Sequence, residues 1–578
     1  MTTLDWLIVA LLCSISLGVG LRFSRKAATQ GASGYFTGNR SLPWWAIGFS
    51  NTATYQSGNG GFVMLVFAFG LAGNWLWWAS WIIWMPLVAI IWAPLWRRMG
   101  IVTTAELLTL RYGGKTARVA RQLYALFLFG IAVLVIGYIT GFFAKTIAPI
   151  VPFSEADILL VFGGVTVIYT LFGGLVGVVF TDVIQFFILL AGNFVFLWLA
   201  VHKLGGWGTI VERAQQLRPE ALQQFPPTEA IPLATFLFLI IQGLFFAGSP
   251  TAGEGMTAQR FLAAKNERHA MGGQFFNAFL ALSLRTLPLI GLGVVAISVF
   301  WSKDLVQQLG PAPSGMRVLS DPAYAWGELV KFCQLPPGLV GMLVAAEAAA
   351  FMSTLSSLIN WGSSFVVNDF YNLYRPGSSR TTQVVVSRLT TLFLFVFAAL
   401  VAIFYVQGMV SWFLFINSVM VVFILPLSWL RFFWWRFNVW GELSAIVLSL
   451  PLSILVWFVL DFQSRPLWQG AGFLFLLSFA LTVLITLLTP AESKETLTRF
   501  YNSCRPPGLW EPVKRTLGLL ETDESETSRL LFNAVLGIVT CLGLVVATNA
   551  IFTSSWGLAT AGIVAAVGSA AWLLRRVF

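Results

Sequence analysis

Charged residues are scarce in this sequence. They make up 10% of its 578 residues, whereas about a quarter of the residues of a typical soluble domain are charged. Hydrophobic residues reach 57%, and the mean hydropathy is +0.80. This balance excludes a soluble enzyme, a disordered protein and a fibrous repeat. The sequence instead predicts an all-α, polytopic membrane protein, because its apolar runs are long enough for helices that satisfy their own backbone within the bilayer.

Histidine and cysteine are also rare. Two histidines give little material for a metal centre, and the four cysteines (Cys13, Cys333, Cys504 and Cys541) show no paired spacing that predicts a disulfide framework. Gly-rich phosphate loops, His-Glu-x-x-His and Gly-x-Ser-x-Gly do not occur. We therefore expect neither enzymatic activity nor an organic cofactor, and any transport must draw its energy from a gradient. The start of the chain has no basic region or cleavage site, which predicts a retained helix.

Long apolar runs are what the sequence has in abundance. Fifteen of them approach or exceed the roughly 20 residues that cross a bilayer. With the N-terminus outside, 26 of the 35 lysines and arginines fall in inner segments, among them 260–268, and 8 fall in outer segments. The positive-inside rule then places the C-terminus in the cytoplasm and the chain in the cell (plasma or inner) membrane. The net charge of +11 reflects these basic loops, so we expect contact with the lipid bilayer and none with nucleic acid.

The order of these runs divides the chain into five parts. They are a leading helix with a basic loop (1–42), a transport core (43–430), additional transmembrane helices (431–489), a cytoplasmic loop (490–529) and C-terminal transmembrane helices (530–578). The loop 490–529 is too short for a catalytic or signalling domain.

Two of the predicted spans break the composition rules of membrane helices. The second, 43–71, carries eight polar residues between Ser50 and Asn59 together with several glycines. The seventh, 231–253, is interrupted near its end by Gly248, Ser249, Pro250, Gly253 and Gly255. Freed backbone groups survive at membrane depth only where they line a cavity or bind something. These spans are five apart, so they cross in opposite directions. Interrupted helices at matching positions of oppositely oriented halves predict an inverted-repeat secondary transporter.

Five sequence blocks then allow a comparison with a known family. They are RSLPWWAIGFS (40–50), TTAELLTLRYG (103–113), YTLFGGLVGVVFTDVIQ (169–185), AQRFLAAKNERHA (258–270) and AAEAAAFMSTLSSLINWGSSFVVNDFY (345–371). In this order and spacing, the chain closely resembles the sodium/solute symporter family, which includes sodium-coupled glucose, proline and pantothenate transporters. The resemblance covers roughly residues 1–430, and none of its motifs falls in 490–578.

The resemblance implies a LeuT-like fold, with a 5+5 inverted repeat, and a sodium site between the second and ninth spans. The matching positions are Ala53 and Gln56, through their carbonyls, and Ala350, Ser353 and Thr354. An unwound helix offers carbonyl oxygens, and neighbouring hydroxyls complete the shell of a hard cation. Membrane hydroxyls more often bond back to their own helix, which is the alternative for the last two residues. Asp182, expected at the turn between spans five and six, matches a residue near the ion-release path, although it can also be a helix cap.

We expect the transported solute to be a small organic molecule, and the residues leave its class open. Sugar-transporting relatives carry polar side chains early in the third span, where this chain has NWLWWASWIIWMP (74–86). The sugar hypothesis is weakened accordingly, and an aromatic wall suits a flatter solute, although tryptophans also anchor helices at the membrane interface. The candidate solute-binding residues are Tyr55, Asn59, Trp77, Gln242, Arg285, Glu347, Asn417 and Ser418.

Arg285 and Glu347 are charged and fall near the bilayer midplane. An intramembrane ionisable residue is a functional-site candidate by default. Either the two form an ion pair that locks spans eight and nine, or Arg285 receives an anionic group of the solute.

The leading hypothesis is a sodium-coupled symporter that takes up the solute by alternating access. One alternative is a transporter-like sensor acting through a partner protein. Another is an uncoupled transporter, which Ser353 and Thr354 oppose because an uncoupled protein needs no ion site.

Overall fold

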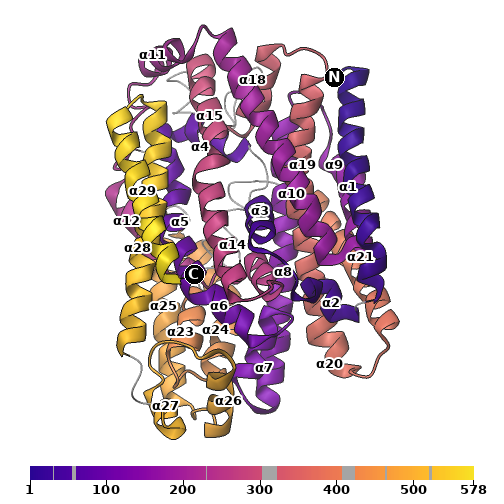
Figure 1. The fold of residues 1–578 in the computed structure, drawn as a ribbon, viewed down its shortest axis with the longest axis vertical. Helices are drawn as coiled ribbons and strands as arrows, with labels where there is room; N and C mark the ends of the chain where they lie inside the picture. The colour runs from indigo at the N-terminus through magenta and orange to yellow at the C-terminus, as the bar shows by residue number, and fades with distance from the viewer. Residues whose placement is uncertain are drawn as a thin grey trace.

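The computed structural model describes residues 1–29, 31–54, 60–229, 231–250, 252–301, 322–405, 424–462, 465–519 and 524–577. These residues form helices and no β-strand (Figure 1). The main helices are α1 (Thr3–Thr29), α2 (Gly31–Thr37), α3 (Trp44–Thr54), α4 (Gly60–Phe69), α5 (Trp75–Leu87), α6 (Ala93–Met99), α7 (Leu107–Arg111), α8 (Gly114–Ile147), α9 (Glu155–Ile158), α10 (Gly164–Lys203), α11 (Trp207–Leu217), α12 (Leu233–Phe246), α13 (Met256–Leu262), α14 (Glu267–Phe279), α15 (Thr286–Phe300), α18 (Ala325–Cys333), α19 (Leu339–Val366), α20 (Asn372–Tyr374), α21 (Arg380–Tyr405), α23 (Leu425–Phe433), α24 (Val439–Ile454), α25 (Leu467–Leu488), α26 (Lys494–Cys504), α27 (Glu511–Leu517), α28 (Glu524–Phe552) and α29 (Trp556–Val577).

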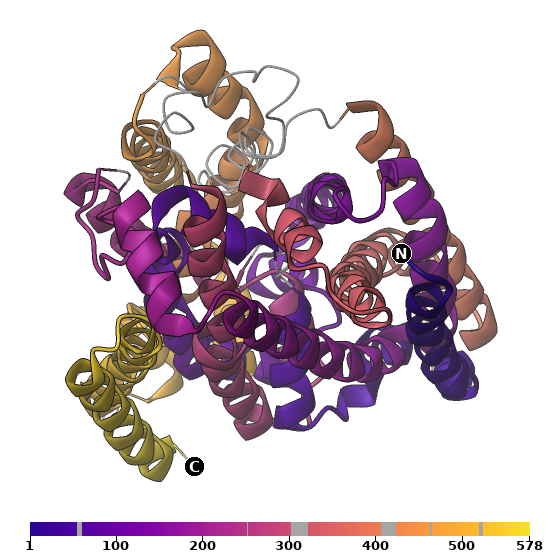
Figure 2. The ribbon, with the colours of Figure 1, turned by 90° about the horizontal axis from the view of Figure 1, so that it is seen from above.

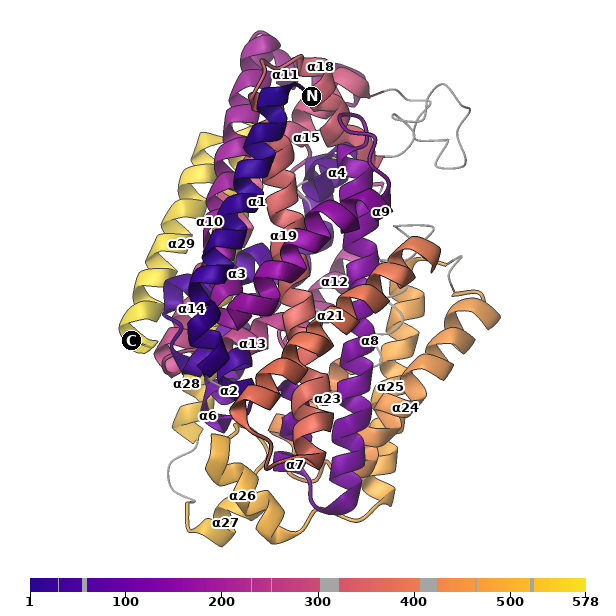
Figure 3. The ribbon, with the colours of Figure 1, turned by 90° about the vertical axis from the view of Figure 1, so that its right-hand side faces the viewer.

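The long helices run roughly side by side between two faces of the molecule. One face carries the N-terminus with α11 and α18, and we call it the N-terminal face (Figures 1 and 3). The other carries α7, α20, α26 and α27, and we call it the α26 face. The chain is a multi-pass helical membrane protein, as the sequence predicted.

Within the described residues, the predicted spans are found with two kinds of difference. These residues contain 11 helical stretches long and apolar enough to cross a membrane. The predicted second and seventh spans are each divided into shorter helices. The fifth and sixth form one stretch, Glu155–Lys203. Most of the predicted span 409–429 lies outside the described residues.

The stretch Glu155–Lys203 bends at a glycine and accounts for two crossings. Its 49 residues would extend about 73 Å as one straight helix, more than twice the ~30 Å hydrocarbon core. The backbone leaves the helical region at Gly174, with φ 56° and ψ −163°, a conformation that glycine tolerates. Asp182, expected at the turn, therefore lies inside the second arm and is fully buried. That placement is wrong because the apolar run continues through the turn at Gly174.

Glycines also make the interruption of the seventh span possible. Between α12 and α13, an added Cβ on Gly253 would lie 2.0 Å from the carbonyl oxygen of Ala247, and one on Gly255 would lie 1.7 Å from that of Pro250. An added Cβ on Gly248 would lie 1.8 Å from the Cβ of Ser428 in α23. The tight chain path at this break therefore requires residues without a side chain.

The packing of the core follows the predicted inverted repeat. The interrupted helix of each half lies against the second helix of the other half, α3 on α14 and α12 on α5. Helix α10, which contributes to the fourth and fifth crossings of the first half, lies against the third helix of the other half, α19, and α21, the fourth helix of the second half, lies against α8. Figure 2 shows the remaining helices at the edges: α1 in indigo on one side, α24 and α25 in orange on another, and α28 and α29 in yellow on a third. Helices α4 and α13 are thereby largely buried within the bundle, whereas α12 leaves apolar side chains such as Leu237 and Ile241 exposed at its edge.

Candidate functional site

Helix α3, before the interruption of the second span, lies against α19, which carries the predicted ion-binding hydroxyls. Thr354 donates its Oγ1 hydroxyl to the carbonyl oxygen of Ala350 at 3.0 Å and to that of Ala53 at 3.4 Å. The first bond is the one that a threonine ordinarily makes within its own helix, whereas the second joins α19 to the last turn of α3. Ala53, Ala350 and Thr354 are thus brought together. Gln56 lies outside the described residues.

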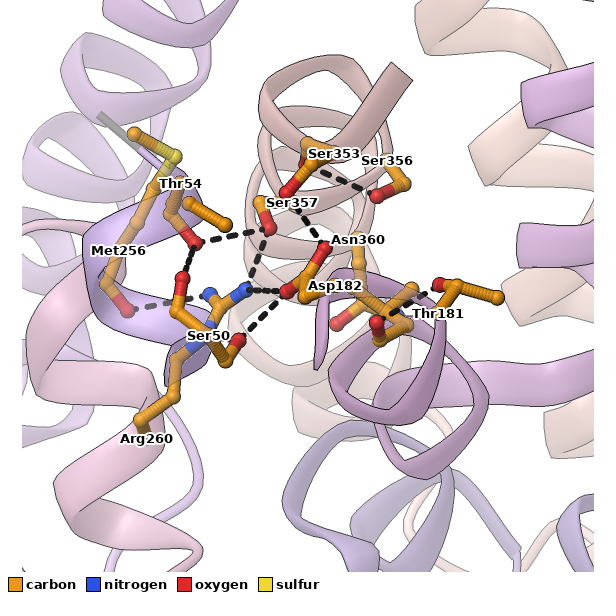
Figure 4. A network of polar contacts seen from close by, with 12 residues as sticks. Ser50, Thr54, Thr181, Asp182, Met256, Arg260, Ser353, Ser356, Ser357 and Asn360 are labelled. Carbon is orange, nitrogen blue, oxygen red and sulfur yellow. Dashed lines mark hydrogen bonds and ion pairs between the residues drawn. The ribbon is translucent and has the colours of Figure 1, made fainter. Parts of the chain in front are cut away.

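Ser353 points to a carboxylate instead of to α3. Its hydroxyl donates to Oδ1 of Asp182 at 2.6 Å, and Ser50 of α3 donates to Oδ2 at 2.5 Å (Figure 4). All three side chains are buried. Asp182 therefore links α10 to both helices of the predicted ion site, in contact with one of its predicted ligands.

Arg260 of α13 completes this buried network. Its Nη2 lies 3.6 Å from Oδ2 of Asp182, and its Nε donates to the hydroxyl of Ser50 at 3.2 Å. It also donates to the Ser357 hydroxyl, which lies 3.3 Å from that of Thr54 (Figure 4). The positive-inside count places Arg260 in a basic loop, and this is wrong because its side chain is fully buried. Four helices that are distant in sequence, α3, α10, α13 and α19, meet at one guanidinium.

The network has a definite chemical capacity. A carboxylate and two hydroxyls present hard oxygen atoms, which suit a small cation. In this structure the guanidinium of Arg260 supplies the compensating positive charge, which a buried carboxylate requires. A small cation at Asp182 would compete with Arg260 for this carboxylate.

The predicted solute residues are placed in different parts of the core. Trp77 is half-buried in α5 and Gln242 is half-buried in α12. Arg285 and Glu347 are buried, and Nη1 of Arg285 donates to the carbonyl of Thr52 at 3.5 Å, near the interruption of the second span. Tyr55, Asn59, Asn417 and Ser418 lie outside the described residues.

Two polar side chains of α14, Gln274 and Asn277, were missed in the sequence. Asn277 accepts a hydrogen bond from the Thr52 hydroxyl at 2.9 Å and donates to Gln274 at 3.1 Å. Asn277 and Arg285, which the sequence did single out, both contact Thr52 of α3. Gln274 and Asn277 are uncharged and stand among bulky apolar residues such as the two phenylalanines between them, so nothing in the sequence marked them.

Two interrupted helices in oppositely oriented halves, with hydroxyls, carbonyls and a carboxylate at the interruption, define an ion-coupled secondary transporter. The comparisons with known proteins extend this assignment. The profile of the sodium:solute symporter family matches residues 35–448. The chain belongs to this family, and sodium-coupled solute symport is the function that membership supports.

Individual relatives are similar at moderate identity. A sodium/glucose cotransporter of Vibrio parahaemolyticus is 28% identical over 494 residues, which cover 79% of this chain and 85% of the relative. The sodium/myo-inositol cotransporter 2 of Mus musculus is 28% identical, with 83% of this chain and 75% of the relative covered. The structure of a Na⁺-coupled sialic acid symporter covers 85% of this chain and 99% of its own, with a TM-score of 0.66 at 20% identity. That likeness shows the fold.

Proposed function

We propose that this protein takes up a small organic solute by alternating access, driven by sodium that binds at Ala53, Gln56, Ala350, Ser353 and Thr354. The observation that carries the ion site is the Thr354 hydroxyl, which bonds at once to the carbonyls of Ala350 and Ala53. Carbonyls at a helix break together with nearby hydroxyls match what a sodium ion needs in place of its water. The protein would need no organic cofactor and would catalyse no chemical reaction.

The proposed orientation places the N-terminal face outside and the α26 face in the cytoplasm of a cell carrying this protein in its plasma or inner membrane. The excess of basic residues in the segments assigned to the α26 face supports it. Sodium moving down its gradient would then travel from the N-terminal face towards the α26 face. Ser50 and Ser357 each lie one helical turn from the predicted ion site in this direction.

We propose that sodium next binds at Asp182 on its way to the cytoplasm. Its contact with Ser353 puts the carboxylate within one side chain of the sodium site. Arg260 holds this carboxylate, so the arrangement corresponds to a closed inner path. Release of sodium to the cytoplasm would require Arg260 and its helix α13 to withdraw from Asp182.

Several classes of solute are candidates for transport. Relatives named for glucose and myo-inositol support sugars and polyols as the first class to test, whereas the tryptophan-rich α5 departs from sugar transporters. Trp77, Gln242, Arg285 and Glu347 remain the proposed contacts, together with Tyr55, Asn59, Asn417 and Ser418. Because the buried guanidinium of Arg285 could bind an anionic group, carboxylates should be tested as solutes together with the sugars and polyols.

Uptake into proteoliposomes tests the function directly. Purified protein is reconstituted, and radiolabelled sugars, polyols, amino acids, carboxylates and nucleosides are offered with an inward gradient of sodium or of potassium. We expect one class to accumulate with sodium and not with potassium. Equal accumulation with both ions would contradict sodium coupling.

A further inference from the structure

A second buried ionic cluster lies beside the interruption of the seventh span. Glu254 belongs to the turn between α12 and α13, and 1% of it is exposed. Nη1 of Arg431, at the end of α23, donates to its two carboxylate oxygens at 2.8 Å and 3.0 Å. The hydroxyl of Tyr124 in α8 donates to the same carboxylate. The interruption is therefore tied by charge to a helix that lies 177 residues further along the chain.

The same guanidinium holds a second carboxylate. Nε of Arg431 donates to both oxygens of Glu442 in α24, at 3.0 Å and 2.8 Å, and Nη2 also bonds to it. The Tyr112 hydroxyl donates to Glu442 at 2.9 Å. Arg431 thus bridges the interruption of the core to the first helix beyond it.

The connection from α23 to α24, which carries Arg431, is held by Arg111. Arg111 of α7 donates to the carbonyls of Arg431 at 3.0 Å and of Phe437 at 2.9 Å, around the connection from α23 to α24. Its guanidinium lies 5.2 Å from the ring centre of Phe500 and 5.0 Å from that of Trp510, in the segment of α26 and α27. Cation–π contacts of this kind are strong when the cation is desolvated. These contacts anchor the backbone around Arg431 at the α26 face.

On its other side, Arg431 is connected through Glu254 and α13 to the ion site. Glu254 is two residues from the start of α13, and the same short helix carries Arg260, which holds Asp182. We propose that Arg431 is a positioning residue for transport: by holding Glu254 it keeps α13, and with it Arg260, in the arrangement that closes the inner path. This inference rests on the proposed function for its consequence in transport.

The chain offers a matched pair of variants that separates positioning from simple stabilisation. Glu254→Gln and Glu442→Gln each remove one carboxylate from Arg431, keep the shape of the side chain and leave one guanidinium with one carboxylate. They differ in which element is released. Glu254→Gln frees the turn before α13, whereas Glu442→Gln leaves that turn held by Arg431.

Hydrogen–deuterium exchange of the full-length protein, without sodium, measures whether α13 is released in each variant. We expect Glu254→Gln to raise the exchange rate of the α13 amides about fivefold or more, the lower end of ordinary coupling between sites. Glu442→Gln should leave these rates unchanged. Glu267→Gln, which alters an exposed ion pair with Arg98, is the surface control. Equal rates in the Glu254→Gln and Glu442→Gln variants would overturn the inference.

Release of radioactive sodium from the purified protein connects α13 to transport. We expect Glu254→Gln to speed release about fivefold or more while Glu442→Gln does not. Equal release from these two variants would overturn the role in transport. Absence of sodium binding by the unaltered protein would instead refute the proposed function, and the exchange measurement would still decide whether Arg431 positions α13.

Discussion

At the scale of single residues, two adjacent hydroxyls of α19 have different partners. Thr354 reaches the carbonyl of Ala53, whereas Ser353 reaches the carboxylate of Asp182. Thr354 would be a direct sodium ligand, whereas Ser353 would also connect the sodium site to Asp182, so mutation of each should have a different effect. The two hydroxyls can therefore be told apart by sodium titration.

We expect Thr354→Ala to raise the sodium concentration for half-maximal uptake about tenfold, because a bond to a charged group is worth about 1.5–3 kcal/mol. Ser353→Ala should raise it as well and should also loosen Asp182. Ser364→Ala is the matched control, since the Ser364 hydroxyl bonds back to Trp361 in the same helix. Unchanged sodium dependence in both site variants would place the ion elsewhere.

The pair of Asp182 and Arg260 gives a second prediction. Asp182→Asn leaves a buried guanidinium without its carboxylate and should destabilise the protein by about 3–5 kcal/mol. The double variant Asp182→Asn, Arg260→Gln should recover most of that loss, measured as the thermal unfolding midpoint in detergent. It should still release sodium abnormally, because the carboxylate on the proposed path is gone. A double variant as unstable as Asp182→Asn alone would show that the two charges do not compensate each other.

Arg285 and Glu347 allow a third prediction at this scale. With a solute role for Arg285, Arg285→Gln inserts normally and binds sodium but loses uptake, and the double variant with Glu347→Gln stays inactive. We expect this outcome, because Arg285 reaches the carbonyl of Thr52 beside the interruption of the second span. Recovery of uptake in the double variant would instead identify a structural ion pair.

The roles of some of these residues could be predicted from the sequence, and those of others could not. Ser353 and Thr354 stand in a motif that resembles a known family, so their chemistry was proposed before any geometry. Arg260 follows the predicted end of the seventh span, where a basic residue ordinarily signals a loop. Only the fold shows that α13 turns back into the core and buries this cation against a carboxylate 78 positions earlier in the chain.

At the scale of elements, the interruptions were predictable and the bend at Gly174 was not. Polar residues and clustered Gly and Pro mark both interrupted spans, because a continuous membrane helix disfavours them. Gly173 and Gly174 stand in an apolar run without a polar residue, as packing glycines of ordinary helices do. The positive φ of Gly174 reveals the turn, and φ is not visible in composition.

The glycines of the seventh span can be tested as a structural requirement. Gly253→Ala should lower the thermal unfolding midpoint and the yield of correctly inserted protein, because its Cβ would lie 2.0 Å from the Ala247 carbonyl. Overpacking typically costs about 1–3 kcal/mol. Gly130→Ala in α8 is the control, since nothing lies within 4 Å of its added Cβ. Equal midpoints for the two variants would mean that the interruption relaxes freely.

At the scale of the whole molecule, the segments after the family match are not equivalent. Trp510 and Phe500 are buried against Arg111, and Glu492 accepts a hydrogen bond from the backbone of Gly113 at 3.0 Å. In contrast, α28 and α29 pack chiefly on each other at one edge of the bundle. The segment of α26 and α27 is therefore part of the folded core, although it carries no family motif.

Truncation separates these two parts. We expect removal of residues 524–578 to leave sodium binding intact in a correctly inserted protein. Removal of 490–578 should lower the thermal unfolding midpoint markedly further, because Arg111 loses its aromatic enclosure. Binding of radioactive sodium and thermal unfolding in detergent measure both effects. Equal stability of the two truncated proteins would contradict the assigned role of α26 and α27.

The buried ion pairs also impose an order on biosynthesis. Glu254 is synthesised 177 residues before Arg431, an interval of about 10–35 s at the usual 5–20 residues per second of translation. Arg121 of α8 forms another buried ion pair, at 2.6 Å, with Asp369, which follows it by 248 residues. During these intervals the ribosome has delivered a charged residue whose partner does not yet exist. The early helices must therefore wait in a place where water still reaches them, such as the membrane interface or the insertion machinery, until the later helices arrive.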